Sequence, residues 1–144
     1  MEVRIEVSPE HKMPRAVIYT DRITPEIQRA LDLLQAKESP VLAERDGRTF
    51  LLAGQEIYMV RVVNGETKLY TKTEEFTARK RLYEALEQLG GGFLQISKSC
   101  AVNLSHVQSV EAGFGWILLL KMKNGLSDYV SRKYLPGFKS HLGL

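Results

Sequence analysis

The sequence predicts a mainly β protein, α+β overall, in which small antiparallel sheets carry a few short peripheral helices. Short runs rich in β-branched and aromatic residues recur along the chain, and turn dipeptides such as Asp46-Gly47 and Asn64-Gly65 separate several of them. Only three segments have helical periodicity. Because those helices do not alternate regularly with the strands, a parallel βαβ sheet is not expected.

The first 39 residues predict two strands and a helix. Val3–Val7 alternates between apolar and charged residues, and Ala16–Tyr19 is a second β-rich run. Thr24-Pro25-Glu26 is a typical helix start, with a hydroxyl cap, a proline and an acid in the first turn. The helix should end near Ala36 and present one apolar stripe, formed by Ile27, Ala30, Leu31 and Leu34.

Residues 1–39 are therefore expected to form a small β-β-α element, and residues 40–144 the main domain. The smaller element is too short to hold a substantial core alone. Two interpretations of it stay open: an arm that docks on a partner or dimerises, and a lid packed on the main domain.

The main domain begins with strands and a helix. Asp46-Gly47 predicts a hairpin within residues 41–53, and Asn64-Gly65 predicts a second one between the strand Ile57–Val63 and the strand Lys68–Thr71. Residues 73–76 continue the β pattern. Residues 79–89 follow as a helix, which the three glycines 90–92 should stop.

The last third is rich in short strands. They are expected at residues 94–96, 100–104, 108–112, 116–122 and 127–130, with a turn at Lys123-Asn124-Gly125 and a final short helix over residues 134–141. In this region Cys100 and Trp116 are expected to pack within the protein, as a small core residue and as part of the strand packing.

Composition is that of an ordinary globular protein, with 44% hydrophobic and 26% charged residues. No run approaches the roughly 18 apolar residues of a membrane span. The N-terminus lacks the pattern of a secretory signal, and the single cysteine supports a reducing compartment. We therefore expect a cytoplasmic protein.

The sequence lacks the usual patterns of catalysis. Nucleophile elbows, paired catalytic carboxylates and phosphate-binding glycine loops are missing, and the three histidines, His11, His106 and His141, have no partners at metal-ligand spacing. We expect no enzyme, no metal site, no cofactor and no small-molecule substrate.

Basic charge is concentrated in the second part of the chain. Residues 1–56 hold 8 Lys and Arg against 10 Asp and Glu, whereas residues 57–144 hold 12 against 7. This asymmetry indicates a polyanionic or acidic partner for the second part. Two polar segments stand out there, Ser97-Lys98-Ser99 and Ser131-Arg132-Lys133, each where a strand gives way to a turn.

These segments belong to an ordered series of motifs. Residues 93–110 read F-x-x-I-S-K-S-x-x-V-N-L-x-x-V-x-S-V, an Asn-Gly turn follows, and residues 129–135 read Y-V-S-R-K-Y-L. Together with Ile57-Tyr58-Met59-Val60, the series resembles the LytTR DNA-binding domain over about residues 46–144. The whole chain is similar to short, stand-alone LytTR regulators of low-GC Gram-positive bacteria.

The resemblance implies an elongated arrangement of small antiparallel β-sheets. It also implies that loops, and not a recognition helix, enter successive major grooves of bent DNA. The implied base-contacting residues are Lys98, Arg132 and, in the first loop, Asn64, Glu66 and Thr67. The acid Glu66 makes that first loop the weakest match.

Charge and position suggest further contacts to phosphate. The candidates are Ser97, Ser99, Lys133, Lys72, Arg79, Lys80 and Lys139. An ion pair with Asp128 is the alternative role for Arg132, and a solvated turn is the alternative for Lys98. We expect Asn103 to stabilise a turn through its amide instead of contacting a base.

The predicted function is a sequence-specific regulator of transcription that binds double-stranded DNA at promoter repeats as a homodimer. Residues 1–39 are too few for a phosphorylatable receiver domain, so control through one is not expected. The resemblance also suggests a small multi-spanning membrane protein as an inhibitory partner, which would tether the chain to the membrane.

Two alternatives come from other classes of function. One is a protein-interaction module or anti-regulator that uses the LytTR scaffold without DNA. The other, binding of single-stranded nucleic acid, lacks the aromatic ladder that this function usually requires.

Overall fold

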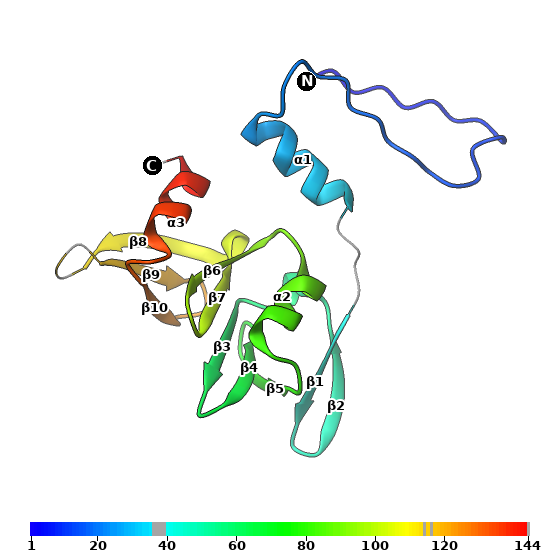
Figure 1. Ribbon diagram of the computed structural model, residues 1–144. Coiled ribbons are helices and arrows are strands. Elements are labelled where there is room, and N and C mark those ends of the chain that lie inside the picture. Colours follow the sequence, from blue (N-terminus) through cyan, green and yellow to red (C-terminus); the bar gives the residue numbers. More distant parts are fainter. Residues whose placement is uncertain (36–39, 114, 116, 144) are drawn as a thin grey trace.

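The computed structural model describes residues 1–35, 40–113, 115 and 117–143. Over these residues the chain forms two antiparallel sheets and three helices (Figure 1). The seven-stranded sheet has the order β2-β1-β5-β4-β3-β7-β6, and the three-stranded sheet has the order β10-β9-β8. The mainly β fold class is confirmed.

The element bounds agree closely with the prediction for the main domain. The strands are β1 (Val41–Arg45), β2 (Arg48–Leu52), β3 (Met59–Val63), β4 (Glu66–Tyr70), β5 (Glu75–Ala78), β6 (Phe93–Ser97), β7 (Cys100–Asn103), β8 (Val107–Ala112), β9 (Leu118–Met122) and β10 (Ser127–Val130). The helices are α1 (Pro25–Gln35), α2 (Leu82–Leu89) and α3 (Leu135–Leu142), and short 3-10 turns cover Gly54–Glu56 and Leu104–His106.

Both predicted two-residue hairpin turns are present. Asp46 and Gly47 have φ angles of 50° and 73°, and Asn64 and Gly65 have φ angles of 52° and 78°. Two successive residues with positive φ define the type I′ turn, whose twist matches that of the flanking strands. The two dipeptides therefore determine where β1 turns into β2 and β3 into β4.

Two core clusters lie on either side of β3. Val60 packs in the first cluster, which includes Phe76 of β5 and Ala85 of α2. Its neighbour Met59 packs in the second cluster, which includes Phe138 of α3. Successive strand residues point to opposite faces, so β3 separates the two cores and α2 and α3 cover different ones.

Helix α2 is shorter than predicted. The expected start at residue 79 is wrong, because the helix begins at Leu82. The Glu84 carboxylate accepts a hydrogen bond from the Arg81 backbone N–H at 3.2 Å and so caps the first turn. Arg79 and Lys80 therefore lie in the turn between β5 and α2. The predicted stop is confirmed, since Gly90 ends the helix with a φ of 81°.

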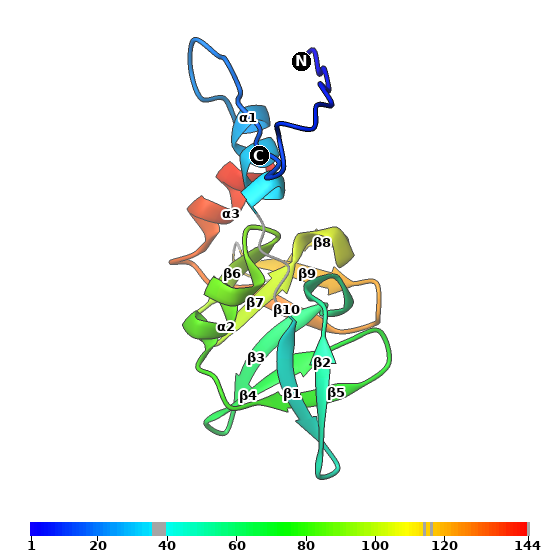
Figure 2. The same cartoon turned by 90° about the vertical axis from the view of Figure 1, so that its right-hand side faces the viewer.

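The two strands predicted in the first 39 residues are not formed. Helix α1 is present, but residues 3–7 and 16–19 have no ladder partner. Alternation creates one apolar face, yet a strand also needs a neighbouring backbone to satisfy its N–H and C=O groups, and none is supplied here. In both views residues 1–24 lie beyond α1, away from the two sheets (Figures 1 and 2).

Helix α1 does not bury its apolar stripe in either core. Leu34, one of the stripe residues, is 62% exposed. The helix approaches the glycine turn after α2, where a Cβ placed on Gly91 would come within 3.1 Å of the Asp32 Cβ. The predicted helix end at Ala36, the boundary at Ser39 and the packing of Trp116 lie outside the described residues.

No helix in the part of the chain that the structure describes is long and apolar enough to cross a membrane.

Candidate nucleic-acid interface

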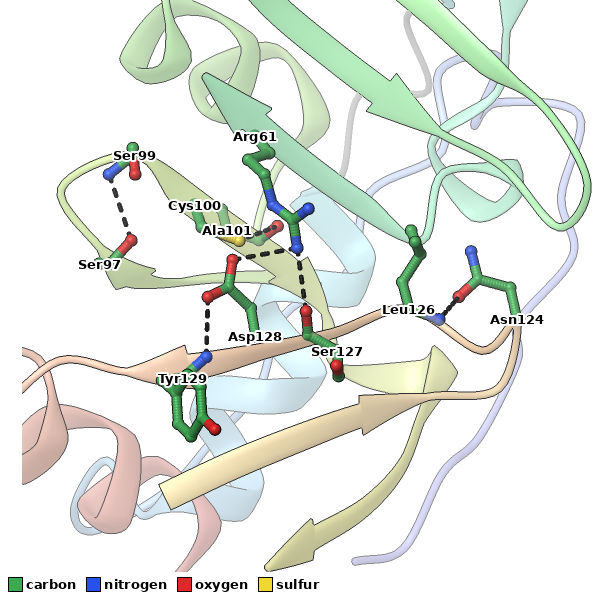
Figure 3. Close-up of polar contacts among 10 residues, drawn as sticks. All are labelled: Arg61, Ser97, Ser99, Cys100, Ala101, Asn124, Leu126, Ser127, Asp128 and Tyr129. Carbon is green, nitrogen blue, oxygen red and sulfur yellow. Dashed lines mark hydrogen bonds and ion pairs between the residues drawn. The ribbon is translucent and has the colours of Figure 1, made fainter. Parts of the chain in front are cut away.

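The three segments predicted to contact bases lie at one end of the protein. They are residues 64–67 at the β3–β4 turn, residues 97–99 at the β6–β7 turn, and residues 131–133 after β10. We call these three segments the loop edge. In Figure 3 the end of β3, the Ser97–Ser99 turn and the end of β10 all lie on the same side of the view.

Backbone hydrogen bonds bring the first two segments together. Strand β3 pairs with β7 so that Arg61 faces Cys100. One residue further, the Val62 N–H donates to the Ser99 carbonyl at 2.8 Å. The end of β3 is therefore fixed beside the start of β7, and their two turns are neighbours.

The third segment is held against β6. The Ser131 N–H donates to the Ile96 carbonyl at 2.8 Å. The Gln95 side-chain amide donates both to the Ser97 carbonyl at 3.0 Å and to the Tyr134 hydroxyl at 3.3 Å. Arg132 thus follows a residue that is bonded directly to the strand leading into the Lys98 turn.

An ion pair joins the two sheets behind the loop edge. The Arg61 guanidinium of β3 lies 3.1 Å from the Asp128 carboxylate of β10 and donates to the Ser127 carbonyl at 3.0 Å (Figure 3). Burial lowers the pKa of Arg61, but Asp128, Cys100 and Tyr70 together raise that pKa above its ordinary value. Arg61 therefore stays charged and holds β10 against the larger sheet.

Sequence reasoning missed this pair. Arg61 and Asp128 come from different sheets and are far apart in the chain, so no local pattern connects them. One signal was available, because Arg61 stands between valines in the otherwise apolar strand Met59–Val63. A charged side chain at such a position commonly has an opposite charge nearby.

Arg132 and Lys98 are both exposed. Neither side chain forms a hydrogen bond or an ion pair with another residue in the described parts of the chain. The alternative role for Arg132, a pair with Asp128, is not formed in the structure, where Asp128 pairs with Arg61 instead. Both cations are free to meet a ligand at the loop edge.

The first loop fits its predicted role only in part. Asn64 is exposed at the tip of the turn. Glu66 lies 3.1 Å from Lys68, which offsets its negative charge. Thr67 is only 5% exposed and lies on a covered face of the sheet, so its predicted base contact disagrees with the structure. Strand alternation explains this result, since Glu66 and Thr67 must face opposite sides.

The predicted phosphate contacts divide by position. Ser97, Ser99 and Lys133 belong to the loop edge, and the Ser97 hydroxyl accepts from the Ser99 N–H at 3.3 Å. Arg79 and Lys80 lie near the same end, because β5 ends beside the start of β4. Both are already engaged, Arg79 with Glu44 at 2.9 Å and Lys80 with Gln88.

The last two candidates lie elsewhere. Lys72 follows β4 at the end opposite to Asn64, where the Thr71 carbonyl accepts from the Asn124 side chain at 2.9 Å. The structure therefore does not bring Lys72 together with the loop edge, because the length of β4 separates the two. Lys139 is exposed on α3.

Asn103 has the turn-stabilising role that we predicted. Its side-chain oxygen accepts from the Ser105 backbone N–H at 3.1 Å and from the Ser105 hydroxyl at 2.7 Å. Its amide donates to the Ile57 carbonyl at 3.0 Å. At 5% exposure Asn103 is a structural residue.

The thiol of Cys100 lies behind the loop edge and is buried. Burial, reinforced by the charge of Asp128, raises its pKa to about 12. The thiol is therefore neutral at physiological pH, which suits a small core residue and not a nucleophile.

Comparisons with known proteins identify the scaffold. Residues 47–143 match the family described as the LytTr DNA-binding domain. A solved structure, described as the LytTr DNA-binding domain of a putative methyl-accepting/DNA response regulator from Bacillus cereus, superposes with a TM-score of 0.71. It shares 21% identity and covers 75% of this chain and 100% of that chain, so it shows the fold.

Curated relatives carry names from signal transduction. Sensory transduction protein LytR of Staphylococcus saprophyticus is 31% identical over 76% of this chain and 44% of its own length. Transcriptional regulatory protein LytR of Staphylococcus aureus strain MW2 is 26% identical over 70% of this chain and 42% of its own length. The matches thus span less than half of these two relatives.

The fold and the family match together define a DNA-binding domain. The chain belongs to the LytTr DNA-binding domain family.

Proposed function

We propose that this chain is a regulator of transcription that binds double-stranded DNA in a sequence-specific way through the loop edge. The observation that carries the proposal is the gathering of Lys98 and Arg132, exposed and without partners in the described chain, on two adjoining turns. The family match and the names of the LytR relatives agree with this class of function.

The shapes are compatible with contact in the major groove. That groove is about 12 Å wide and about 8.5 Å deep, which admits a two-stranded β ribbon such as a hairpin tip. The planar fork of Arg132 matches the O6 and N7 acceptors of guanine, and Lys98 reaches the same acceptors with a single ammonium group. Ser97, Ser99 and Lys133 then serve as phosphate contacts that position the domain.

We further propose that two chains bind repeated half-sites on one promoter. DNA binding by these 144 residues would require no phosphorylated receiver domain. A purified chain that binds its site without any phosphate donor supports this part, and binding that appears only after phosphorylation contradicts it.

Association with an inhibitory membrane protein is a separate proposal. Its basis is the family resemblance together with residues 1–35, which lie outside both cores and offer surface to a partner. Co-purification with membranes should be compared for the full chain and for a form without residues 1–39. Equal distribution of the two forms between membrane and soluble fractions overturns it.

The experiment that tests the main proposal is capture of genomic fragments by the purified chain, followed by footprinting. We expect a recurring sequence with two half-sites at a fixed spacing, protected at physiological salt. Fragments without a common sequence, or no retained DNA, contradict the proposal and favour a protein-interaction module on the same scaffold.

A further inference from the structure

Residues 3–7 form an extended segment with an uncovered apolar face. Val3, Ile5 and Val7 are 77%, 83% and 93% exposed. Both views place this segment beyond α1, away from the two sheets (Figures 1 and 2). The protein therefore carries a strand-like sequence whose backbone and apolar side chains have no partner within the described chain.

The opposite face of this segment carries one base and one acid. Arg4 and Glu6 are two residues apart, so they point to the same side in extended backbone. The structure shows this directly, since their side chains form an ion pair while both remain more than two-thirds exposed. The segment is thus apolar on one face and charged with both signs on the other.

This charge pattern is self-complementary. If two copies of the segment pair in antiparallel fashion about Ile5, residue Arg4 of each copy faces Glu6 of the other. Val3 of each copy then faces Val7 of the other, and the two Ile5 side chains meet at the axis. Such an arrangement has the two-fold symmetry expected of a homodimer interface.

The edge strands of the sheets do not offer the same match. Strands β2 and β6 are the edges of the larger sheet; β2 carries Arg48 and no acid, and β6 carries no charge. Strands β8 and β10 are the edges of the smaller sheet and carry only an acid each. None of these four strands places an acid and a base two residues apart.

The second extended segment is a weaker candidate for the axis. Ala16–Tyr19 also lies between charges of opposite sign, Arg15 and Asp21. Its central residue, Ile18, is partly covered, whereas Ile5 is 83% exposed. The first segment therefore has the more accessible centre.

We propose that Val3–Val7 is a dimerisation strand that pairs antiparallel with the same segment of a second copy, with the two-fold axis at Ile5. A two-stranded ribbon of this length is marginal by itself, so the dimer is concentration-dependent. Binding of two chains to neighbouring half-sites would raise their local concentration and strengthen the contact. This interface deepens the pairing of chains proposed above, but it is tested without DNA, so the two proposals fail separately.

Charge variants of the full chain provide the test. Arg4→Glu places acids opposite acids in a homodimer, and Glu6→Arg places bases opposite bases. Each variant alone should dimerise at least about tenfold more weakly than the native chain in sedimentation equilibrium, because like charges directly opposite each other destabilise a strand pair.

A mixture of the two single variants distinguishes contact between chains from loss of the Arg4–Glu6 pair within each chain. In a mixed dimer every acid of one copy faces a base of the other, so dimerisation should return to the native level or above it. The Arg4–Glu6 pair within each chain stays broken in this mixture. Rescue therefore reports contact between chains, and a mixture no more dimeric than the separate variants overturns the proposal.

Cross-linking tests the register. Ile5→Cys should form a disulfide-linked dimer under mild oxidation, because residues at the axis face each other at bridging distance. Val17→Cys, equally placed in an extended segment, should not cross-link. Cross-linking at Val17 alone, or a native chain that remains monomeric at every concentration tested, contradicts the assignment.

Discussion

At the scale of single residues, Arg132 and Lys98 are exposed cations without an ion pair or a side-chain hydrogen bond in the described chain. Lys72 shares this property, but of these three cations only Arg132 and Lys98 lie at the loop edge. Arg61 is held by Asp128, Lys68 by Glu66, and Arg79 by Glu44. A cation that already has a partner must give it up to bind DNA, whereas a free one needs only to lose water and counterions. We therefore expect the free cations of the loop edge, and not the paired ones, to contact DNA.

Replacement of Arg132 by alanine should reduce specificity at one base position. The expected cost is about 1–3 kcal/mol on the preferred site, with little change on sequences altered at that position. Competitive gel-shift measurements on single-base variants of the site provide the check. Lys139→Ala is the control, because Lys139 on α3 is a predicted phosphate contact. Phosphate contacts carry no sequence information, so its loss should weaken binding to all sequences to a similar extent. Equal losses for every sequence with Arg132→Ala would contradict a base-reading role.

The thiol of Cys100 should react with alkylating reagents only when the protein unfolds. Its pKa is raised to about 12 from 9.0, so the folded state keeps the thiol neutral where the unfolded state begins to ionise it. The contribution of this group to stability is complete below pH 9.0 and declines as the pH rises toward 12. Labelling followed by mass spectrometry, with and without denaturant, measures this protection. Rapid labelling of the folded chain would show that the thiol is accessible.

At the scale of elements, two-residue turns position the loop edge. The Asn64-Gly65 turn requires positive φ at both residues, and Gly65 has a φ of 78°. Gly65→Ala introduces no clash, since a Cβ there meets nothing within 4 Å, so its cost comes from backbone conformation alone. We expect a loss of about 1–2 kcal/mol in the free energy of unfolding.

Gly137 provides the matched control for this substitution. A Cβ added at Gly137 also meets nothing within 4 Å, but this glycine lies in α3 without a positive φ. Gly137→Ala should therefore be neutral or stabilising, because alanine favours helices. Urea unfolding of both variants measures the difference. Equal stabilities would show that the positive φ at Gly65 does not set the cost of the substitution.

The ion pair between Arg61 and Asp128, which joins the two sheets, leads to a second prediction at this scale. Asp128→Asn keeps the shape of the side chain but removes the charge that faces the half-buried Arg61. We expect a loss of about 1–3 kcal/mol in unfolding free energy. The more exposed pair of Lys121 and Glu111, 3.2 Å apart, is the comparison, and Glu111→Gln should cost no more than about 1 kcal/mol. Thermal unfolding that shifts equally for both variants would contradict a structural role for Asp128.

The elements of the main domain could be predicted because their signals are local. The Asp46-Gly47 and Asn64-Gly65 dipeptides require particular φ angles, and the glycines after α2 stop that helix wherever the rest of the chain lies. Residues 3–7 have an equally regular alternation, yet they form no strand. Alternation describes one face of a strand and does not supply the neighbour that the backbone needs.

The candidate site could be predicted only in part for a related reason. The motifs indicated which turns carry Lys98 and Arg132, but not that Lys72 lies at the opposite end of β4. That placement depends on strand direction and sheet order. The pair between Arg61 and Asp128 depends on how two sheets meet, which no short stretch of sequence records.

At the scale of the whole molecule, the chain combines turns that are hydrogen-bonded to the sheets with an N-terminal segment that has no ladder partner. The loop edge is built from turns that backbone hydrogen bonds connect to both sheets. Residues 1–24 lie away from those sheets and have only local hydrogen bonds. By our two proposals, the loop edge meets DNA and the N-terminal segment meets a second copy of the chain.

The loop edge is, by this account, the surface that meets DNA. Lys98 and Lys72 test that claim as a matched pair, since both are exposed lysines in tight turns at opposite ends of the larger sheet. The measurement is the affinity of the full chain for its selected site across a salt series.

Lys98→Ala should weaken binding to the selected site and flatten the dependence of log affinity on log salt, because it removes a cation from the surface that meets DNA. The loss should be concentrated at the base position that Lys98 contacts. Lys72→Ala should match the native chain in affinity and slope. Loss with Lys72→Ala and none with Lys98→Ala would place the DNA at the other end of the molecule and contradict the account.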